Sequence, residues 1–317
     1  MQPARDMPTQ PSRHLLKIED MNDVTIEHFL KRGEYFVQRF KRGEKKEPNL
    51  HGRTIINAFY EASTRTRVSF EIAAKRLGAD IVNFSTQMAS SSKGESLRDT
   101  AITLNAMRPD AIVVRSNESE ATKIFADNVD CAVINAGNGS DEHPTQALLD
   151  ALTIRQTKGR IEGLTVAICG DILHSRVCHS NIHLLTRMGA KIHAIGPQTL
   201  LPEKSQFPDV AFFETMQEGL RGADIVMMLR IQRERMKEAF MLTEEDYFKS
   251  YGLDEEKLSF AKPDAHVMDP GPVIRGVHIA SSVADGPRSL IAKQVENGVA
   301  IRAAVLETLI LRQPGKS

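Results

Sequence analysis

Short apolar runs and amphipathic stretches alternate along most of the chain. The runs are rich in β-branched residues, as buried strands are, and the stretches between them repeat apolar residues at helical spacing. Strands are predicted at 54–59, 80–84, 111–115, 132–135, 164–168, 191–195, 210–213, 224–229 and 266–268. Helices are predicted at 24–40, between residue 63 and Gly78, and at 95–107, 118–126, 144–156, 177–188 and 288–311. This alternation predicts parallel sheets that are covered on both faces.

A break at Gly159–Gly163 separates two such alternations. We therefore predict an α/β fold of two doubly wound parallel-sheet domains joined by helices, with the C-terminal helix returning to the first domain. The predicted limits are 14–143 plus 289–317 for the first domain, 144–288 for the second, and 1–13 for a mobile N-terminal segment. Such folds bind ligands at the carboxyl ends of their strands, so the cleft between the domains is the expected site.

Composition excludes several classes of function. The chain has 41 basic and 41 acidic residues and 5% aromatic residues, without the basic excess of a nucleic-acid groove. No apolar run approaches the roughly 20 residues that cross a bilayer, and residues 1–13 lack the apolar core of a secretory signal. Three cysteines do not make a disulfide framework. These features predict a cytoplasmic protein that binds neither nucleic acid nor membrane.

The segment Ser63–Arg67 consists of five consecutive residues with donor side chains, placed where the strand at 54–59 gives way to a helix. The first N–H groups of a helix lack intrahelical partners and the helix dipole is positive there, so an anion is favoured. No carboxylate interrupts the segment. It predicts a phosphate site, with an ordinary N-cap beside two solvated arginines as the alternative.

Further candidates lie just after other predicted strands. Arg115 ends a β-branched strand, where an anion would explain it; the alternative is an ion pair with Glu118 or Glu120. His143 and Gln146 stand at the start of the helix that opens with Pro144, so both can reach one crevice, although a histidine before proline is usually a capping or surface residue.

Candidates for a carboxylate ligand occur in the second half. Arg176 begins a helix after a loop without the glycine fingerprint of dinucleotide sites. Arg230 and Gln232 alternate to one side of their segment, as a carboxylate-binding pair should; the alternative is a plain basic loop. Asp269–Pro272 offers mainly carbonyl oxygens, which suit an amide NH2; the alternative is a plain turn. Cys178, His179 and His183 lack further ligands at zinc spacing, so no metal is predicted.

Two of these segments carry a resemblance. Ser-Thr-Arg-Thr-Arg at 63–67 and His-Pro-Thr-Gln at 143–146 resemble motifs of the aspartate and ornithine carbamoyltransferases, and the matches extend from about residue 15 to 310. The aspartate branch is the more similar. Glu61 stands where ornithine enzymes commonly have lysine, Lys93-Gly94-Glu95-Ser96 replaces their Arg-Gly-Glu, and the segment at 269–272 lacks their cysteine.

The resemblance implies transfer of the carbamoyl group of carbamoyl phosphate to L-aspartate, giving N-carbamoyl-L-aspartate and phosphate in pyrimidine biosynthesis, without cofactor or metal. Its implied carbamoyl phosphate ligands are Ser63, Thr64, Arg65, Thr66, Arg115, His143, Gln146, Gly271 and Pro272. Its implied L-aspartate ligands are Lys93, Arg176, Arg230 and Gln232. Its implied catalytic residues are Arg65, Thr66, Lys93, Arg115 and His143. Glu61 is expected to pair with Arg176 or Arg235 when the domains close.

The chain also departs from the family. Members usually carry histidine at Asp269, asparagine at Ile274 and glutamate at His278, so the loop that presents Pro270–Pro272 is expected to be set differently. The serine loop before Lys93 is shortened. The hydroxyl that accompanies Lys93 is therefore one of Ser90, Ser91 and Ser92.

Family members form homotrimers in which the serine-lysine loop enters the neighbouring subunit's site. The sequence leaves open whether regulatory or dihydroorotase-type chains join such a trimer. It also leaves rival functions: a carbamoyltransferase for another amine such as ornithine, and a non-catalytic subunit that keeps the phosphate site. A nucleotide-binding dehydrogenase is disfavoured by the missing glycine fingerprint.

Overall fold

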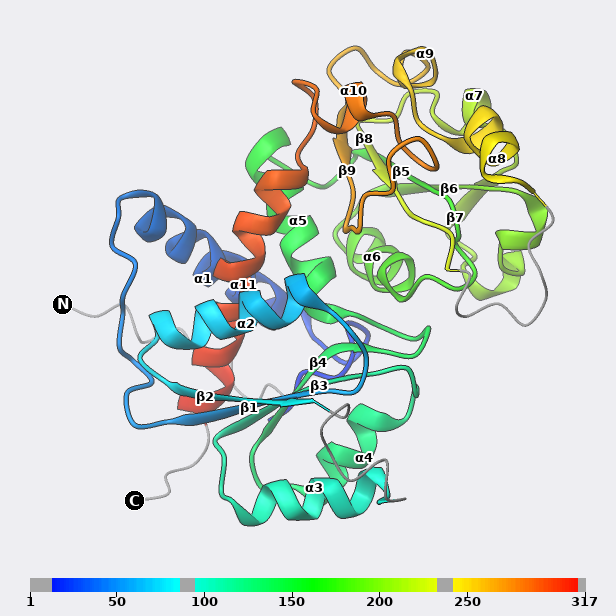
Figure 1. The fold of residues 1–317 in the computed structure, drawn as a ribbon. Helices are drawn as coiled ribbons and strands as arrows, with labels where there is room; N and C mark the ends of the chain where they lie inside the picture. Colours follow the sequence, from blue (N-terminus) through cyan, green and yellow to red (C-terminus); the bar gives the residue numbers. More distant parts are fainter. Residues whose placement is uncertain (1–12, 86–94, 233–241, 313–317) are drawn as a thin grey trace. The chain divides into compact units, whose positions relative to one another are not determined.

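The structure is a computed structural model that describes residues 13–85, 95–232 and 242–312. Its compact units are unit 1, Met1–Leu152 with Val295–Ser317, and unit 2, Thr153–Gln294. Each unit contains one parallel β-sheet, as the strand–helix alternation predicts (Figure 1). The division between the units falls inside two long helices, whereas the sequence placed the domain limits before them. The predicted domain limits remain a prediction.

Unit 1 contains a four-stranded sheet with the strand order β2-β1-β3-β4. The strands are β1 (Thr54–Phe59), β2 (Asp80–Ser85), β3 (Ala111–Ser116) and β4 (Ala132–Asn138). The helices are α1 (Asp23–Lys41), α2 (Thr64–Arg76), α3 (Leu97–Ala106), α4 (Ala121–Asn128), the first part of α5 (Pro144–Lys158) and most of α11 (Ile291–Leu311). Helices α3 and α4 cover one face of the sheet and α1, α2 and α11 the other (Figure 1).

The strand order of unit 1 reverses between β1 and β3. Strand β1 has β2 on one side and β3 on the other, and α2, which follows β1, and α4, which follows β3, lie on opposite faces of the sheet (Figure 1). Helices that diverge in this way leave a crevice at the carboxyl ends of the two central strands. This edge of the sheet is therefore the place for a ligand in unit 1.

Helix α11 packs on α1, which confirms that the C-terminal helix returns to the first domain. The residue that permits the contact is Gly33, because a Cβ built there would lie 2.5 Å from Cδ1 of Ile301. The helices are also joined by the ion pair between Arg32 and Glu307 and by a 3.0 Å contact between His28 Nε2 and Thr308 Oγ1. A glycine inside a helix costs about 1 kcal/mol relative to alanine. Here the missing Cβ allows the two helices to pack closely.

Unit 2 is a five-stranded sheet in the order β7-β6-β5-β8-β9, which reverses between β5 and β8. The strands are β5 (Thr165–Cys169), β6 (Lys191–Ile195), β7 (Val210–Phe213), β8 (Ile225–Met228) and β9 (His266–Met268). The helices are α6 (Arg176–Arg187), α7 (Met216–Gly219), α8 (Glu244–Tyr251), α9 (Glu255–Leu258) and α10 (Ser281–Ala284), with 3-10 turns η3 (Gln198–Leu200) and η4 (Lys204–Gln206). Its core contains Val226, Leu253 and Val283, among others.

The predicted strands all occur close to their predicted positions, and β1, β6, β7 and β9 match residue for residue. The sequence did not predict α7 to α10, which are too short to repeat an apolar period clearly. Helix α4 begins later than predicted, at Ala121, with Glu120 as its N-cap residue. Among the described residues, none of the helices combines the length and apolarity needed to span a bilayer.

Candidate functional site

The predicted anion-binding residues of unit 1 share one edge of its sheet. The strands are parallel, so β1, β3 and β4 end at the same edge. Ser63–Thr66 follow β1, Arg115 lies near the end of β3, and His143 follows β4. The fold therefore brings together residues that are separated along the chain, at the point where the strand order reverses.

The start of α2 is open to an anion. Ser63 is the N-cap residue, yet its side chain makes no capping hydrogen bond, and the first turn contains no acidic residue. By contrast, the side chains of Asn22, Ser96, Ser175 and Thr243 cap α1, α3, α6 and α8. Thr66 is buried and Arg65 is exposed. The start of α2 therefore has no side-chain N-cap, and the positive end of its helix dipole can bind an anion.

Arg115 already holds a carboxylate. Its Nη2 lies 2.7 Å from Oε1 of Glu61, its Nη1 donates to the carbonyl of Ala136 at 2.9 Å, and its side chain is 13% exposed. The ion pair that was the alternative interpretation thus involves Glu61, rather than the predicted Glu118 or Glu120. Of the partners expected for Glu61 on closure, Arg235 lies outside the described residues. Arg115 therefore meets an anionic oxygen at this edge.

The amide of Gln146 has a defined orientation. Helix α5 begins at Pro144, as predicted, and Gln146 is 7% exposed. Its Nε2 donates to Oδ1 of the fully buried Asp150 at 3.0 Å. A carboxylate only accepts hydrogen bonds, so the NH2 end faces Asp150 and Oε1 is left as the acceptor for another group. The sequence analysis missed Asp150, whose signal is a carboxylate four residues after Gln146.

Buried polar groups hold the loop that leads to His143. Asn135 Nδ2 donates to the carbonyls of Leu16 and Glu142, at 2.8 and 3.2 Å. The Glu142 side chain accepts from the main-chain N of Ile18 at 2.8 Å. Buried amides and carboxylates need such partners, so these contacts fix the approach to His143. Sequence reasoning gave neither residue a role, although an asparagine that ends an apolar strand is a signal.

In unit 2, a close approach at Gly170 joins the ends of β5 and β8. Gly170 has φ +128°, and a Cβ there would lie 2.3 Å from the carbonyl oxygen of Leu229, so only glycine fits. The next residue, Asp171, is fully buried. Its carboxylate accepts from the main-chain N of His174 at 3.1 Å and of Gln232 at 3.0 Å. Asp171 therefore ties together the two loops that carry the predicted carboxylate ligands.

Those ligands follow neighbouring strands. Arg176 is 3% exposed and begins α6, as predicted, after Ser175, whose side chain accepts from the N of Cys178. Arg230 is half-buried and its Nη1 donates to the carbonyl of Ile231 at 3.1 Å. Gln232 Nε2 donates to the carbonyl of Arg230 at 3.4 Å. Two guanidinium groups and an amide thus follow β5 and β8, on either side of the reversal in strand order.

Several other predicted site residues do not belong to the two groups of residues described above. Lys93, the serines Ser90, Ser91 and Ser92, and Arg235 lie outside the described residues. Gly271 and Pro272 follow β9 in unit 2, in a loop that is half-buried at Gly271 and exposed at Pro272. The roles of all these residues remain predictions.

The cysteine and histidines of α6 have other surroundings. Cys178 is fully buried, and burial raises the pKa of its thiol well above the ordinary range. The rings of His179 and His183 pack against Phe207, and His179 Nε2 lies 3.1 Å from the carbonyl of Ile172. Within the described ranges, no group of three or more histidine, cysteine or acidic side chains is placed to hold a metal ion.

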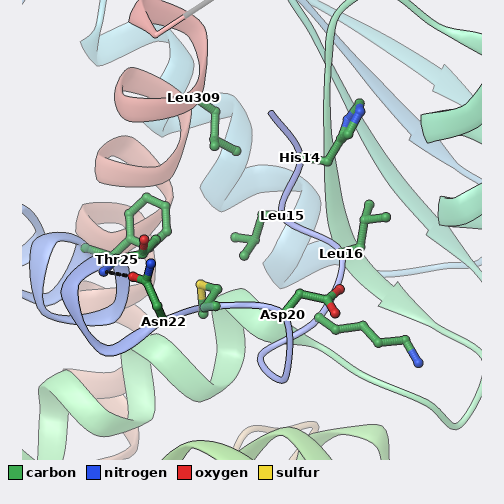
Figure 2. Close-up of a pocket in the computed structure, with 10 residues that line it drawn as sticks. His14, Leu15, Leu16, Asp20, Asn22, Thr25 and Leu309 are labelled. Carbon is green, nitrogen blue, oxygen red and sulfur yellow. Dashed lines mark hydrogen bonds between the residues drawn. The ribbon is translucent and has the colours of Figure 1, made fainter. Parts of the chain in front are cut away.

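A separate cavity of about 140 Å³ lies between residues 14–22, α1 and α11. Figure 2 shows Leu15 and Leu309 beside it, with Asn22 capping α1 by accepting from the N of Thr25. None of the predicted site residues lines this cavity. It is therefore distinct from the candidate site.

His14, at the edge of this cavity, leads to a prediction about stability. Burial, with the charge of Arg13, lowers the pKa of His14 from 6.5 to about 4, and its Nδ1 accepts from the N of Val133. The unfolded chain therefore binds more protons between these two pH values, so the free energy of unfolding should fall as the pH drops from 6.5 towards 4.

Urea unfolding at pH 7 and pH 5 tests this expectation. His14→Asn keeps an acceptor for the N of Val133, so the free energies of unfolding at pH 7 and pH 5 should differ less than in the wild type. The same difference in the variant and the wild type would contradict the prediction. Part of the difference should remain, because burial also lowers the pKa of His28 and His266.

The fold and the candidate site define a class: a two-unit, doubly wound α/β protein with candidate anion-binding groups at the carboxyl ends of both sheets. Residues 13–156 match the carbamoyl-P binding domain of the aspartate/ornithine carbamoyltransferases, and residues 162–309 match their Asp/Orn binding domain. The chain therefore belongs to the aspartate/ornithine carbamoyltransferase family, which confirms the resemblance of its motifs.

Two relatives are similar over nearly the whole chain. The sequence is 58% identical to the aspartate carbamoyltransferase catalytic subunit of Methylorubrum populi over 311 residues, 98% of this chain and 99% of that one. It is 59% identical to that of Xanthobacter autotrophicus over 306 residues, 96% and 97% of the two chains.

Solved structures from both branches of the family share the fold. Aspartate transcarbamoylase from Trypanosoma cruzi, in complex with carbamoyl aspartate and phosphate, has a TM-score of 0.83 and 29% identity, with 93% of this chain and 94% of that chain covered. Ornithine carbamoyltransferase from Pyrococcus furiosus has a TM-score of 0.82 and 28% identity, with 93% and 96% covered. The fold alone therefore does not separate the two acceptors.

Proposed function

We propose that this protein is an aspartate carbamoyltransferase: it transfers the carbamoyl group of carbamoyl phosphate to L-aspartate, giving N-carbamoyl-L-aspartate and phosphate, a step of pyrimidine biosynthesis. The observation that carries the proposal is Arg115, whose guanidinium holds a carboxylate beside a helix start without a side-chain cap. Relatives of 55–59% identity that are named aspartate carbamoyltransferase catalytic subunits support it.

In this proposal unit 1 binds carbamoyl phosphate. The phosphate occupies the start of α2, where Ser63, Thr64, Arg65 and Thr66 supply donors, and it replaces Glu61 at Arg115. Displacement frees Glu61 for its predicted role in closure. Thr66, Arg115 and His143 face the carbonyl oxygen, and Gln146 Oε1 accepts from the carbamoyl NH2 because its own NH2 end is held by Asp150.

The reaction needs no covalent intermediate and no cofactor. The unprotonated α-amine of aspartate attacks the carbonyl carbon, a C–N bond forms, and the C–O bond to phosphate breaks. The departing phosphate takes the proton from nitrogen. Donors aimed at the developing oxyanion contribute about 3 kcal/mol each in well-studied cases, and positioning of the two substrates contributes the rest.

Specificity for aspartate rests on unit 2. Aspartate brings two carboxylates, for which Arg176, Arg230 and Gln232 supply guanidinium and amide donors. Guanidinium groups bind carboxylates with two parallel hydrogen bonds, whereas the ammonium group of ornithine would be repelled. The remaining predicted cation, Lys93, is proposed to enter the site from a neighbouring subunit of a cytoplasmic homotrimer.

A carbamoylation assay with L-aspartate and L-ornithine offered separately tests the assignment. We expect turnover with aspartate and at least about 10³-fold lower kcat/KM with ornithine, because ornithine leaves buried donors unpaired. Equal or faster turnover of ornithine would reassign the acceptor. No turnover with either amine would indicate a non-catalytic phosphate-binding subunit.

A further inference from the structure

A buried imidazole–carboxylate contact joins both ends of the loop that follows β9. His278 Nε2 lies 2.7 Å from Oδ2 of Asp269, and the two residues are 0% and 3% exposed. An ionised carboxylate only accepts, so the ring N–H donates to it. Between these residues, Pro272 and Ile274 are exposed. The loop is therefore an exposed arc with a buried anchor.

Both ends of the arc are fixed to the interior of unit 2. The main-chain N of Asp269 donates to Oε1 of Gln294 at 2.9 Å. At the other end, the carbonyl of His278 accepts from the N of Leu253 at 2.9 Å, and the N of Ala280 donates to the carbonyl of Leu253 at 2.8 Å. Leu253 is itself fully buried. The contact between Asp269 and His278 thus links two points that the core already holds.

The second oxygen of Asp269 acts inside the loop. Oδ1 accepts from the main-chain N of Gly271 at 2.5 Å. Pro270 and Pro272 have no N–H group, so Gly271 carries the only main-chain donor of the Pro-Gly-Pro segment, and Asp269 occupies it. The main chain of this segment therefore offers hydrogen-bond acceptors alone.

A segment of this kind selects its ligand. Carbonyl oxygens bind groups that donate, such as an amide NH2, and they repel the oxygens of phosphates and carboxylates. We propose that Asp269 and His278 are positioning residues that make Pro270–Pro272 an acceptor-only segment for the NH2 of the carbamoyl group. His278 orients the carboxylate, and the carboxylate withdraws the single competing donor. This inference rests on the proposed function, whose substrate carries that NH2.

The test combines hydrogen exchange and kinetics on the full chain. Asp269→Ala releases the N–H of Gly271, so its amide should exchange about 10-fold faster or more. The kcat/KM for carbamoyl phosphate should fall about 10-fold, while the inhibition constant of inorganic phosphate, which has no NH2, should stay within about 2-fold. Asp269→Asn keeps an acceptor for the N–H of Gly271. Its amide exchange rate and its kcat/KM for carbamoyl phosphate should therefore both stay close to the wild-type values.

Asp224→Asn is the matched control. Asp224 is also a buried carboxylate of unit 2, where it accepts from the N of Thr165 and contacts Lys262 at the opposite, amino end of the sheet. Its replacement should lower the melting temperature without changing the exchange of Gly271 or the kinetics. A general loss of stability would instead lower activity in both variants.

Each outcome decides the proposal. Unchanged exchange at Gly271 in Asp269→Ala, or equal losses for carbamoyl phosphate and inorganic phosphate, would overturn it. If Asp269→Ala does not fold, His278→Ala, which removes only the orienting ring, is measured instead. It should also speed the amide exchange of Gly271 and lower kcat/KM for carbamoyl phosphate, but by smaller factors. Should the wild type not transfer carbamoyl groups, the proposed function and the ligand assignment fail together, and the exchange data still decide whether Asp269 holds Gly271.

Discussion

Replacing Arg115 by alanine is expected to lower kcat for carbamoyl transfer by about 10²- to 10³-fold. In the structure the guanidinium binds a carboxylate through Nη2 and a main-chain carbonyl through Nη1. In the proposed reaction it neutralises the phosphate and donates to the carbonyl oxygen as negative charge develops there. Alanine removes both interactions. Steady-state kinetics with saturating aspartate measure the loss.

Arg53 provides the matched control for this variant. It pairs with Asp110 at 3.0 Å, just before β1, at the amino edge of the same sheet. Arg53→Ala removes an arginine–carboxylate pair of the same kind without touching the carboxyl edge, so kcat should stay within about 2-fold. Equal losses in Arg53→Ala and Arg115→Ala, or an unchanged kcat in Arg115→Ala, would show that Arg115 has no direct part in the reaction.

Replacing Arg230 by alanine is expected to raise the KM for L-aspartate by about 10- to 100-fold, the usual effect of losing a hydrogen bond to a charged group. The KM for carbamoyl phosphate should change little, because its proposed main ligands lie in the other unit. Arg230→Lys should recover part of the loss, since lysine restores the charge but not the planar pair of donors. Initial rates with each substrate varied in turn separate the two constants.

Arg221 is an exposed arginine of unit 2 before β8 and serves as the control. Arg221→Ala changes the net charge by the same amount as Arg230→Ala and should leave both KM values unchanged. If Arg230→Ala instead weakened carbamoyl phosphate and spared aspartate, the proposed division of ligands between the units would be reversed.

The fold could be predicted largely from the sequence because its signals are local. Apolar runs such as Thr54–Phe59 and Lys191–Ile195 are short enough to be strands and are bounded by charged or glycine-containing segments. The start of α5 was readable because proline suits the first turn of a helix. Helices α8 and α9 were missed because they are short and their apolar faces show no repeat, although the capping residues Thr243 and Asp254 and the acidic first turns are helix-start signals.

The candidate site could be predicted only in part. Arg115, His143 and Arg176 stand out as polar residues at the ends of apolar elements, and the structure places each at the carboxyl edge of a sheet. Their partners are less visible. The pairing of Glu61 with Arg176 or Arg235 on closure stays a prediction, and the sequence did not indicate the contact that Glu61 makes with Arg115 in the same unit. The departures at Asp269 and His278 were expected to alter one loop, but the sequence did not show that the two side chains contact each other.

The sequence by itself determined the strands, the main helices, the family and the residue types available for phosphate and carboxylate binding. Tertiary structure alone decided which of those residues meet: Arg115 with Glu61, Gln146 with Asp150, and Asp269 with both His278 and Gly271. The reason is physical. Secondary structure follows from the periodicity of neighbouring residues, whereas most side-chain partnerships depend on strand order and loop closure, which local periodicity does not encode.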